Sequence, residues 1–324
     1  MTPSPPTIAL TCASDAGYAP YATAMLCSAL RCTPQARFRI YYLHAPDLDA
    51  SARKLVQQSL APYAARTELH FIEVPDALVE GLPLFKAMKP GAIRPVMWYR
   101  VFLPQLVPQE PRILYLDSDI VVVESLLPLW NLDLDGYALA AVTNPFWGRE
   151  VQGWGRACGL QREADYFNSG VMLLNLDHWR AHDVTAQVVK HGLANADWTR
   201  FGDQDSLVVI LHAQRLAIPP RWNAMRAVML APQSRGLFES AALRVAIQKP
   251  AIVHFEGSLK PWIDPREHPY GRLYMRYAKR LPWPVVSKPF SLLDIENFFI
   301  RHNWARLSHF TFRLRRKLAA RKQG

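Results

Sequence analysis

The stretch "RILYLDSDIVVV", residues 112–123, places two carboxylates in a run of Leu, Ile, Val and Tyr side chains. Aspartate weakens a strand, and an ionised carboxylate resists burial. The pattern therefore predicts a core strand over residues 112–116 that reaches the edge of its sheet at Asp117. A bend there would let Asp117 and Asp119 converge on one divalent cation, whereas the alternative is a turn held by local hydrogen bonds.

Outside this stretch, apolar runs typical of strands alternate with helical patterns, which predicts a mostly parallel sheet covered by helices. Ligands of such sheets bind at the carboxyl ends of the strands. The chain has 324 residues, of which 50% are hydrophobic, and this is enough for one large core or two modest ones. The expected strands are 7–14, 36–44, 68–74, 137–144, 170–176, 215–219 and 251–255, and the expected helices are 20–31, 49–61, Asp177–His191 and Asp203–Ala213.

The formal charge of +11 is concentrated at the C-terminus. Residues 301–324 contain six Arg and two Lys and no acidic residue, so they contribute +8 of that charge. Apolar side chains recur at helical spacing through the same segment, which predicts a basic amphipathic helix. The apolar stripe consists of Ile300, Trp304, Leu307, Phe310, Leu314 and Leu318.

Such a helix suits an anionic membrane surface, because its aromatic face can enter the interface while its charges meet the lipid headgroups. Packing onto the body of the protein is the alternative. We expect no nucleic acid partner, because the apolar stripe would then have nothing to cover it. The three prolines of residues 281–290 indicate a linker. We therefore expect one domain over residues 1–280, followed by a linker and a membrane-associating tail over residues 281–324.

No stretch of the sequence has the length and apolar character of a membrane-spanning helix, and the N-terminal segment lacks the basic start of a signal peptide. The expected location is the cytoplasm, with the tail on the inner face of the cytoplasmic membrane. The four cysteines show no C-x-x-C spacing. They are expected to be free thiols packed as small apolar residues, rather than disulfides or zinc ligands.

Two further motifs place polar residues beside apolar runs. In "YFNSGVMLLNLDHWR" (166–180), Asn168 and Ser169 precede a strand, and Gly170 leaves room for a ligand at the backbone, unless these residues only form a turn. In "GDQDSLVVI" (202–210), two acids and an amide exceed the needs of a helix cap. A polar ligand therefore competes with capping as the explanation of that motif.

A last motif, "IVHFEGSLKPW" (252–262), ends a short strand with His254 and carries Lys260, which could reach a phosphate. A histidine after a strand is often a structural residue only. Together with Asp117 and Asp119, however, it would complete a site of two carboxylates and one imidazole for a divalent cation.

These motifs, in this order, resemble glycosyltransferase family 8, the retaining sugar-nucleotide transferases that include bacterial lipopolysaccharide galactosyl- and glucosyltransferases. Two other segments, "CASDAGYAPYATAMLCSAL" (12–30) and "WYRVFLPQLV" (98–107), are similar to the family as well. The resemblance extends over residues 7–265. It implies an α/β nucleotide-binding Rossmann-like domain of the GT-A type with a mixed central sheet, a UDP-hexose donor, and Mn²⁺, with Mg²⁺ as a second possibility.

The resemblance also implies roles by motif position. Gln204, Asp203 and Lys260 would act in catalysis, with Gln204 near the reacting face of the sugar. The family often has asparagine before the tyrosine of its first motif, so Gly17 here puts one nucleotide contact in doubt. The implied metal ligands are Asp117, Asp119 and His254, and the implied donor contacts are Ala13, Asp15 and Tyr18 at the uridine, Gly257 and Lys260 at the diphosphate, Arg100, Asn168, Asp203 and Gln204 at the sugar, and Asp117, Ser118 and Ser169 elsewhere along the donor.

The implied reaction transfers galactose or glucose to a saccharide acceptor, such as lipopolysaccharide core or another glycolipid. An amide is a poor nucleophile, so Gln204 favours front-side attack, in which the diphosphate takes the proton of the acceptor hydroxyl and Asp203 orients the sugar. A covalent role for Asp203 is the alternative. One other interpretation is an inactive sugar-nucleotide-binding or scaffold protein. A second is an aspartate-based phosphatase, because "LDSDIV" resembles the nucleophile motif of those enzymes, although their site usually lies on an early strand.

Overall fold

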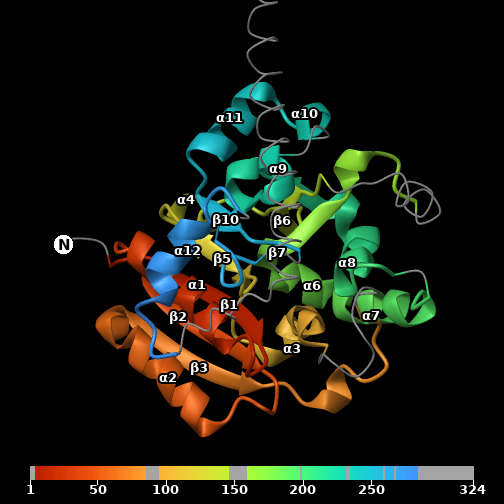
Figure 1. Ribbon diagram of the computed structural model, residues 1–324. Coiled ribbons are helices and arrows are strands. Elements are labelled where there is room, and N and C mark those ends of the chain that lie inside the picture. Colours follow the sequence, from red (N-terminus) through yellow and green to blue (C-terminus); the bar gives the residue numbers. More distant parts are fainter. Residues whose placement is uncertain are drawn as a thin grey trace, which may run out of the picture.

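A seven-stranded sheet in the order β3-β2-β1-β4-β7-β6-β8 forms the middle layer of the protein (Figure 1). Buried residues lie on both faces of its central strands, so helices must cover both faces. The computed structural model describes residues 4–84, 95–145, 159–197, 199–230, 234–257, 260–265 and 268–283.

The first four strands of this sheet run parallel, as the alternating pattern predicts. Parallel neighbours need a crossover connection, and helices α1 (Ala19–Cys32) and α2 (Ala50–Leu60) provide the first two. Asp49 caps α2 by accepting a hydrogen bond from the Ala52 N–H at 2.7 Å. The four strands are β1 (Thr7–Ser14), β2 (Arg37–His44), β3 (Thr67–Glu73) and β4 (Arg112–Leu116).

One strand of the sheet is reversed. β7 (Phe167–Asn175) runs antiparallel to β4 and to β6 (Leu139–Thr143), whereas β8 (Arg215–Ala217) is again parallel to β6. The reversal arises because the chain re-enters the sheet at the end where β6 leaves it, as the hydrogen bond from Asn144 N–H to the Tyr166 carbonyl at 2.8 Å demonstrates. The sheet is therefore mostly parallel but mixed, in agreement with the expected fold class.

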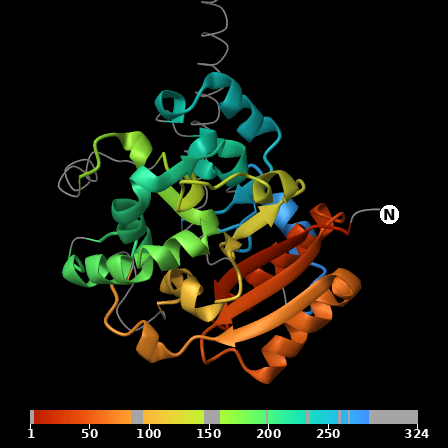
Figure 2. The same cartoon turned by 180° about the vertical axis from the view of Figure 1, so that it is seen from behind.

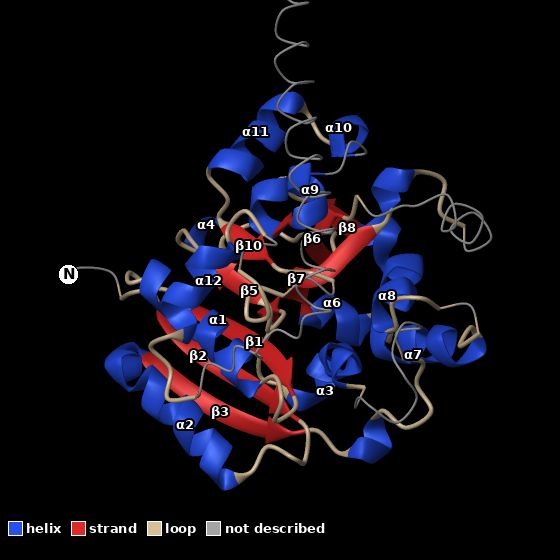
Figure 3. Cartoon of the chain, viewed as in Figure 1, coloured by secondary structure: helices blue, strands red, loops and turns tan. Residues whose placement is uncertain are grey.

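A small second sheet packs beside the first. Its strands are β5 (Ile120–Val122), β10 (Ile252–His254) and β9 (Ala224–Met225), in that order. β5 follows β4 after only three residues, so the chain changes sheets at the two carboxylates. Figure 3 shows β5, β7 and β10 together in the middle of the molecule.

The helix expected over Asp177–His191 is instead two helices, α6 (Leu176–Ala181) and α7 (Val184–Ala194). The break lies at Asp183, whose backbone is left-handed with φ 50° and cannot continue a right-handed helix. The helix expected from Asp203 is confirmed as α8 (Asp203–Leu211). The other helices are α3 (Leu103–Leu106), α4 (Leu127–Trp130), α9 (Arg226–Leu230), α10 (Ser234–Leu237), α11 (Ser240–Gln248) and α12 (Gly271–Ala278), and two short 3-10 segments, Val96–Phe102 and Pro220–Asn223, are used below.

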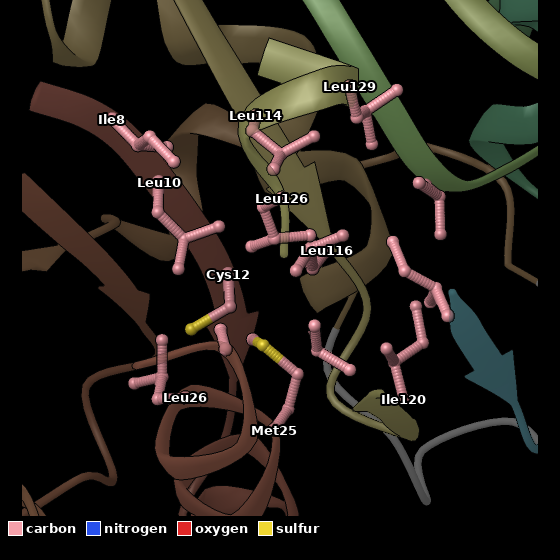
Figure 4. Close-up of a cluster of buried hydrophobic side chains, with 14 of the residues drawn as sticks. Ile8, Leu10, Cys12, Met25, Leu26, Leu114, Leu116, Ile120, Leu126 and Leu129 are labelled. Atoms are coloured by element: carbon pink, nitrogen blue, oxygen red, sulfur yellow. The ribbon is translucent and has the colours of Figure 1, made fainter. Parts of the chain in front are cut away.

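Alternate residues of the strands enter two cores. Ile8, Leu10 and Cys12 of β1 pack against Met25 and Leu26 of α1 (Figure 4). The opposite face of the sheet packs against the 3-10 segment Val96–Phe102, α3 and the helices α6 to α8. The protein thus has three layers, which Figure 2 shows from behind.

The expected basic tail lies outside the described residues, which end at Trp283. Leu281 and Trp283, at the start of the expected linker, pack against the core on the α1 side of the sheet. The described cysteines, Cys12, Cys27 and Cys32, are free thiols, as expected, and Cys158 lies outside the described part. None of the helices in the described part of the chain has the length and hydrophobicity that a membrane crossing requires.

Candidate active site

The two carboxylates that follow β4 lie where the two sheets meet. Residues 117–119 form the turn between β4 and β5. The Ser118 hydroxyl donates to the Ala13 carbonyl at 2.8 Å, and the Asp117 N–H donates to the Gly170 carbonyl at 2.8 Å. These bonds fix the turn at the carboxyl end of β4, where ligands of such sheets bind.

Asp117, Asp119 and His254 converge as the sequence predicts, with one ligand atom of each within 4.8 Å of the others. Antiparallel pairing of β10 with β5 places His254 opposite Ile120, next to Asp119. His254 Nε2 lies 3.2 Å from Asp119 Oδ1 and 3.8 Å from Asp117 Oδ2. Two carboxylate oxygens and an imidazole nitrogen could hold a divalent ion such as Mn²⁺.

Lys260 compensates the charge of Asp119. Its Nζ donates to a carboxylate oxygen of Asp119, and to the Phe255 carbonyl at 2.8 Å. Burial raises the pKa of Asp119, but Lys260 and His254 outweigh this effect and hold that pKa below its ordinary value. Burial lowers the pKa of His254 and of Lys260, whereas Asp119 raises both above their ordinary values. A cationic amine therefore stands within reach of the candidate metal ligands.

Gly170 makes this close packing possible. A Cβ at this position would lie 2.4 Å from Cε1 of His254 and 2.6 Å from Oδ2 of Asp117. The sequence interpretation, in which Gly170 leaves room for a ligand at the backbone, is therefore corrected. The space is occupied by the side chains of two candidate metal ligands.

Arg100 connects the carboxylate turn to α8. Its Nη1 donates to Asp117 Oδ1 at 3.0 Å and to the Ser169 carbonyl at 2.7 Å, and its Nε lies 2.8 Å from Asp203 Oδ2. Burial lowers the pKa of Arg100, but Asp117 and Asp203 raise it above its ordinary value, so the guanidinium stays charged. Burial raises the pKa of Asp203 to about 7, against the opposing effect of Arg100.

Gln204, beside Asp203 at the start of α8, points its amide at the start of β7. Its Oε1 accepts hydrogen bonds from the Ser169 N–H at 3.0 Å, from the Ser169 hydroxyl at 3.2 Å and from Asn168 Nδ2 at 3.2 Å. The motifs at 166–180 and 202–210 therefore form one polar cluster, which capping of α8 alone does not require.

The residues assigned to the uridine lie at the carboxyl end of β1. Asp15, one residue past that strand and two residues from Ala13, accepts a hydrogen bond from the Tyr18 N–H at 2.8 Å. Tyr18 is 42% exposed, and its ring meets Trp262 edge-on, with ring centroids 6.2 Å apart. Gly257 has a φ of 78°, a backbone conformation that favours glycine.

Two residues of this site escape sequence reasoning. Asn223, at the end of the 3-10 segment Pro220–Asn223, is fully buried and hydrogen bonds both His254 and Asn168. Tyr166 is buried beneath Gln204 and hydrogen bonds its amide. The only signal for Tyr166 is its position in the motif at 166–180, and Asn223 lies in a segment without helical or strand periodicity.

Comparison with known proteins identifies the group to which this fold and site belong. A family model described as Glycosyl transferase family 8 matches residues 9–265. A solved structure of the galactosyltransferase LgtC in complex with donor and acceptor sugar analogs has a TM-score of 0.73 and 25% identity, and covers 85% of this chain and 97% of that one. A second structure, of an active-site mutant of LgtC in which glutamate replaces a glutamine, has the same TM-score.

Two curated relatives are similar to this chain over more than half of its length. General stress protein A of Bacillus subtilis is 28% identical over 285 residues, which is 86% of this chain and 96% of the relative. The lipopolysaccharide 1,2-glucosyltransferase of Escherichia coli is 26% identical over 188 residues, which is 58% of this chain and 55% of the relative. Because the family model covers most of its length, this chain belongs to glycosyltransferase family 8.

Proposed function

We propose that this glycosyltransferase moves galactose or glucose from a UDP-sugar to a saccharide acceptor, with retention of configuration and with a divalent metal ion. The observation that carries the proposal is the convergence of Asp117, Asp119 and His254 beside Lys260. A cluster of oxygen and nitrogen ligands next to an amine suits the diphosphate of a sugar nucleotide, which brings its own oxygen ligands to a metal. An aspartate-based phosphatase is disfavoured, because the carboxylates follow the fourth strand and the family is that of glycosyltransferases.

We assign Asp117, Asp119 and His254 to Mn²⁺, with Mg²⁺ as the second possibility. The bound ion would stabilise the negative charge that develops on the leaving diphosphate. Lys260, on its long flexible side chain, would exchange its bond to Asp119 for a bond to the phosphate oxygens. Gly257 would let the loop that carries Lys260 approach the diphosphate.

For the rest of the donor, we keep the assignment that the resemblance to the family implies. Ala13, Asp15 and the exposed ring of Tyr18 would hold the uridine, and the hydroxyl of Ser118, bonded to Ala13, would keep the turn beneath it. The sugar would lie toward the cluster of Arg100, Asn168, Ser169, Asp203 and Gln204, where carboxylate, amide and guanidinium groups meet.

Front-side attack is the mechanism we favour. The acceptor oxygen forms its bond to the anomeric carbon on the face from which the diphosphate oxygen departs, and the hydroxyl proton passes to the diphosphate. An amide is a poor nucleophile, and the Gln204 oxygen already accepts three hydrogen bonds. Asp203 is paired with Arg100 at 2.8 Å, which suits it to orienting the sugar. Gln204→Ala and Asp203→Asn should lower turnover without a covalent intermediate, and a trapped glycosyl adduct on either residue would contradict this mechanism.

The acceptor we propose is a saccharide at a membrane surface, such as lipopolysaccharide core or another glycolipid. The named activity of the Escherichia coli relative supports a lipopolysaccharide acceptor. The basic amphipathic pattern of residues 291–324 supports binding to an anionic surface. Deletion of these residues should release the protein from phosphatidylglycerol vesicles while leaving UDP release in solution intact. Equal binding of the full and shortened chains to the vesicles would remove this part of the proposal.

The test of the donor is UDP release by the purified protein with UDP-galactose and UDP-glucose in parallel, with Mn²⁺ and with EDTA. Metal-dependent hydrolysis of one sugar nucleotide would support the proposal and identify the sugar. Metal-dependent binding of UDP without any turnover would favour the inactive scaffold instead. Neither binding nor turnover would contradict the proposed function altogether.

A further inference from the structure

Behind the candidate metal ligands, six buried side chains form a continuous series of hydrogen bonds. It begins at His254, a candidate metal ligand, and ends at Asp205 in α8, and every member is at most 8% exposed. Its links are His254 Nδ1 to Asn223 Oδ1 at 2.9 Å, Asn223 Nδ2 to Asn168 Oδ1 at 2.7 Å, Asn168 Nδ2 to Gln204 Oε1 at 3.2 Å, Gln204 Nε2 to Tyr166 Oη at 3.0 Å, and Tyr166 Oη to Asp205 Oδ1 at 2.6 Å. We call this series the amide chain.

The backbone of β7 fixes the direction of the amide chain. The Ser169 N–H donates to Gln204 at 3.0 Å, and the Gly170 N–H donates to Asn168 at 2.9 Å. A backbone N–H can only donate, so each contacted side-chain atom must be the amide oxygen and not the amide nitrogen. The orientation of the Gln204 and Asn168 amides is thus set by the main chain. If either amide were rotated by 180°, its NH₂ group would face a backbone N–H, and two donors would meet.

This direction is transmitted to His254. Since Asn168 Oδ1 is an acceptor, the atom of Asn223 that meets it must be the nitrogen, and the other atom of the same amide must be the oxygen. That oxygen lies 2.9 Å from Nδ1 of His254, which therefore carries a proton. Nε2, on the other side of the ring, is then the nitrogen that can offer a lone pair to a metal.

At the other end, a carboxylate closes the amide chain. The Tyr166 hydroxyl accepts from Gln204 and so must donate to Asp205. The second oxygen of Asp205 accepts from the N–H groups of Arg200 at 2.6 Å and Phe201 at 2.9 Å. A carboxylate that only accepts is the end point that this sequence of donors needs.

We propose that Asn223 and Tyr166 are positioning residues of the transferase site. Asn223 connects the imidazole assigned to the metal with the amides assigned to the donor sugar, and Tyr166 holds the Gln204 amide from below. The inference rests on the proposed function, because it concerns the same metal and donor. It adds that the two parts of the site are oriented by one shared amide, so that a change at Asn223 acts on both.

The test uses the whole chain, three test variants and two control variants. The Kd of Mn²⁺ is measured by calorimetry in the presence of UDP, and kcat and KM are measured by UDP release. Asn223→Leu removes both bonds and should weaken Mn²⁺ binding by about 10- to 100-fold, the usual effect of losing the partner of a metal-binding histidine. Asn175→Leu is the matched control. Its amide also joins two chain segments, at the opposite end of β7, so it should lower the melting temperature and leave the Kd of Mn²⁺ unchanged.

Asn223→Asp tests the bond to His254 separately from the bond to Asn168. One carboxylate oxygen can still accept from His254, but the other faces the oxygen of Asn168, where a donor is required. The Kd of Mn²⁺ should then stay within about threefold of the native value, while kcat falls by about 10-fold or more, because the sugar-side amides lose their orientation. A folded Asn223→Asp or Asn223→Leu protein with native Kd and native kcat would overturn the role of Asn223.

Tyr166→Phe tests the other end, and Tyr41 offers a closely matched control. Tyr41 is also a buried tyrosine whose hydroxyl accepts from a glutamine amide, Gln109, and donates to a carboxylate, Glu110, each at 2.7 Å. Both substitutions should lower the melting temperature. Only Tyr166→Phe should lower kcat, by about 10-fold, with little change in KM. Equal kcat values in Tyr166→Phe and Tyr41→Phe would show that Tyr166 supports the fold only and does not position Gln204.

A readout without metal keeps this inference separate from the proposed function. In metal-free, ¹⁵N-histidine-labelled protein, the Nδ1 proton of His254 should be protected and shifted downfield, and Asn223→Leu should abolish that signal. If the signal is present and the native protein binds neither Mn²⁺ nor UDP, the amide chain stands and the proposed function fails. If the native protein binds both but Asn223→Leu leaves the signal and the Kd unchanged, the inference fails alone.

Discussion

The candidate site contains two regions that place polar groups in the core by different means. In the charged region, comprising Asp117, Asp119, Arg100, Lys260 and Asp203, each acidic side chain lies within 3.0 Å of a basic one. In the amide region, comprising Asn168, Asn223, Gln204 and Tyr166, the four side chains are neutral and pair donor to acceptor, and Tyr166 donates to the carboxylate of Asp205. The first region is partly open, with 26% of the Asp117 side chain exposed, whereas each residue of the second is at most 8% exposed.

The two regions suit two tasks of a transferase site, the stabilisation of charge and the orientation of groups. Charges stabilise other charges, so they belong where a cation and a diphosphate would enter from water. Neutral amides contribute direction at a smaller desolvation cost, because an unpaired amide costs far less to bury than an unpaired ion. The two regions should therefore differ in how they respond to substitution, metal and pH.

The largest effect is expected where the regions meet, at Gly170. In Gly170→Ala the added Cβ would displace His254 and Asp117 on one side and crowd Asn168, 3.0 Å away, on the other. A displacement of about 1 Å costs about 100-fold in rate for one group, so UDP release should fall by more than about 1000-fold when both regions shift. Gly236→Ala is the control, since its Cβ would meet nothing within 4 Å. Native turnover in Gly170→Ala would show that the two regions are not packed as described.

A somewhat smaller effect is expected from Asp119→Asn, which breaks the charged region alone. Lys260 loses its carboxylate while its side chain is only 12% exposed, so the free energy of unfolding should fall by about 3 kcal/mol. Metal affinity should fall by about 100-fold, because a charged ligand is lost.

The double variant Asp119→Asn/Lys260→Met sharpens this prediction. Removing the unpaired ammonium should restore most of the lost stability in a urea titration, but none of the metal affinity. If the double variant were as unstable as the single one, the pair would not be the source of the stability, and the charged region would have to be held by other contacts.

The charged region was the predictable part of the site. Asp117 and Asp119 follow β4, and Asp203 opens α8, so apolar periodicity locates these carboxylates. Arg100, inside the 3-10 segment Val96–Phe102, is indicated only by the family resemblance. Asp117, Asp119 and His254 converge because the ends of β4 and β10 bring them together. The parallel strands of the first half are predictable on the same basis, because each apolar run is long and bounded by polar turns.

The amide region was predictable only in part, because Asn168 and Gln204 lie in the motifs at 166–180 and 202–210 but Asn223 lies in none. Asn223 closes a short 3-10 segment, and its two partners are 31 and 55 residues distant in sequence, so no local pattern indicates it. The break between α6 and α7 at Asp183 was not predicted for a similar reason. One left-handed residue leaves the helical spacing of the apolar residues on either side almost unchanged. The role of Gly170 was misread, because sequence alone cannot tell whether a ligand or another side chain fills the space beside a glycine.

Acid should lower the stability of the fold beside the charged region by protonating His268. The Tyr270 N–H donates to Nδ1 of His268 at 3.1 Å, and within the described residues Nε2 is buried without a hydrogen-bond partner. Burial, together with the positive charges of Arg226 and His254, lowers the pKa of His268 to about 3. The unfolded chain takes up this proton near pH 6.5, so the stability is fully present above that pH and is lost as the pH falls toward 3.

Between pH 6.5 and 4.5 this single group should cost the native protein about 2 to 3 kcal/mol. His268→Gln should remove that part of the pH dependence, whereas His182→Gln, on an exposed side chain, should not. The measurement is the midpoint of urea unfolding at several pH values. Parallel pH profiles of the native protein and His268→Gln would exclude His268 as the source of the acid sensitivity.

The smallest effect is expected at the rim of the charged region, where Tyr21 of α1 stacks on Trp262 with ring centroids 3.8 Å apart. Lys260 Nζ lies 5.5 Å from the same Trp262 ring, so this stack helps to hold the lysine. Tyr21→Leu should cost about 1 kcal/mol of stability and raise the KM for the UDP-sugar a few-fold, with kcat nearly unchanged. His70→Leu removes a ring that stacks on Tyr41, on the β2–β3 side of the sheet, and should cost similar stability with no change in KM. An equal rise in KM in both variants would mean that the effect comes from general loosening of the fold, and not from the position of Lys260.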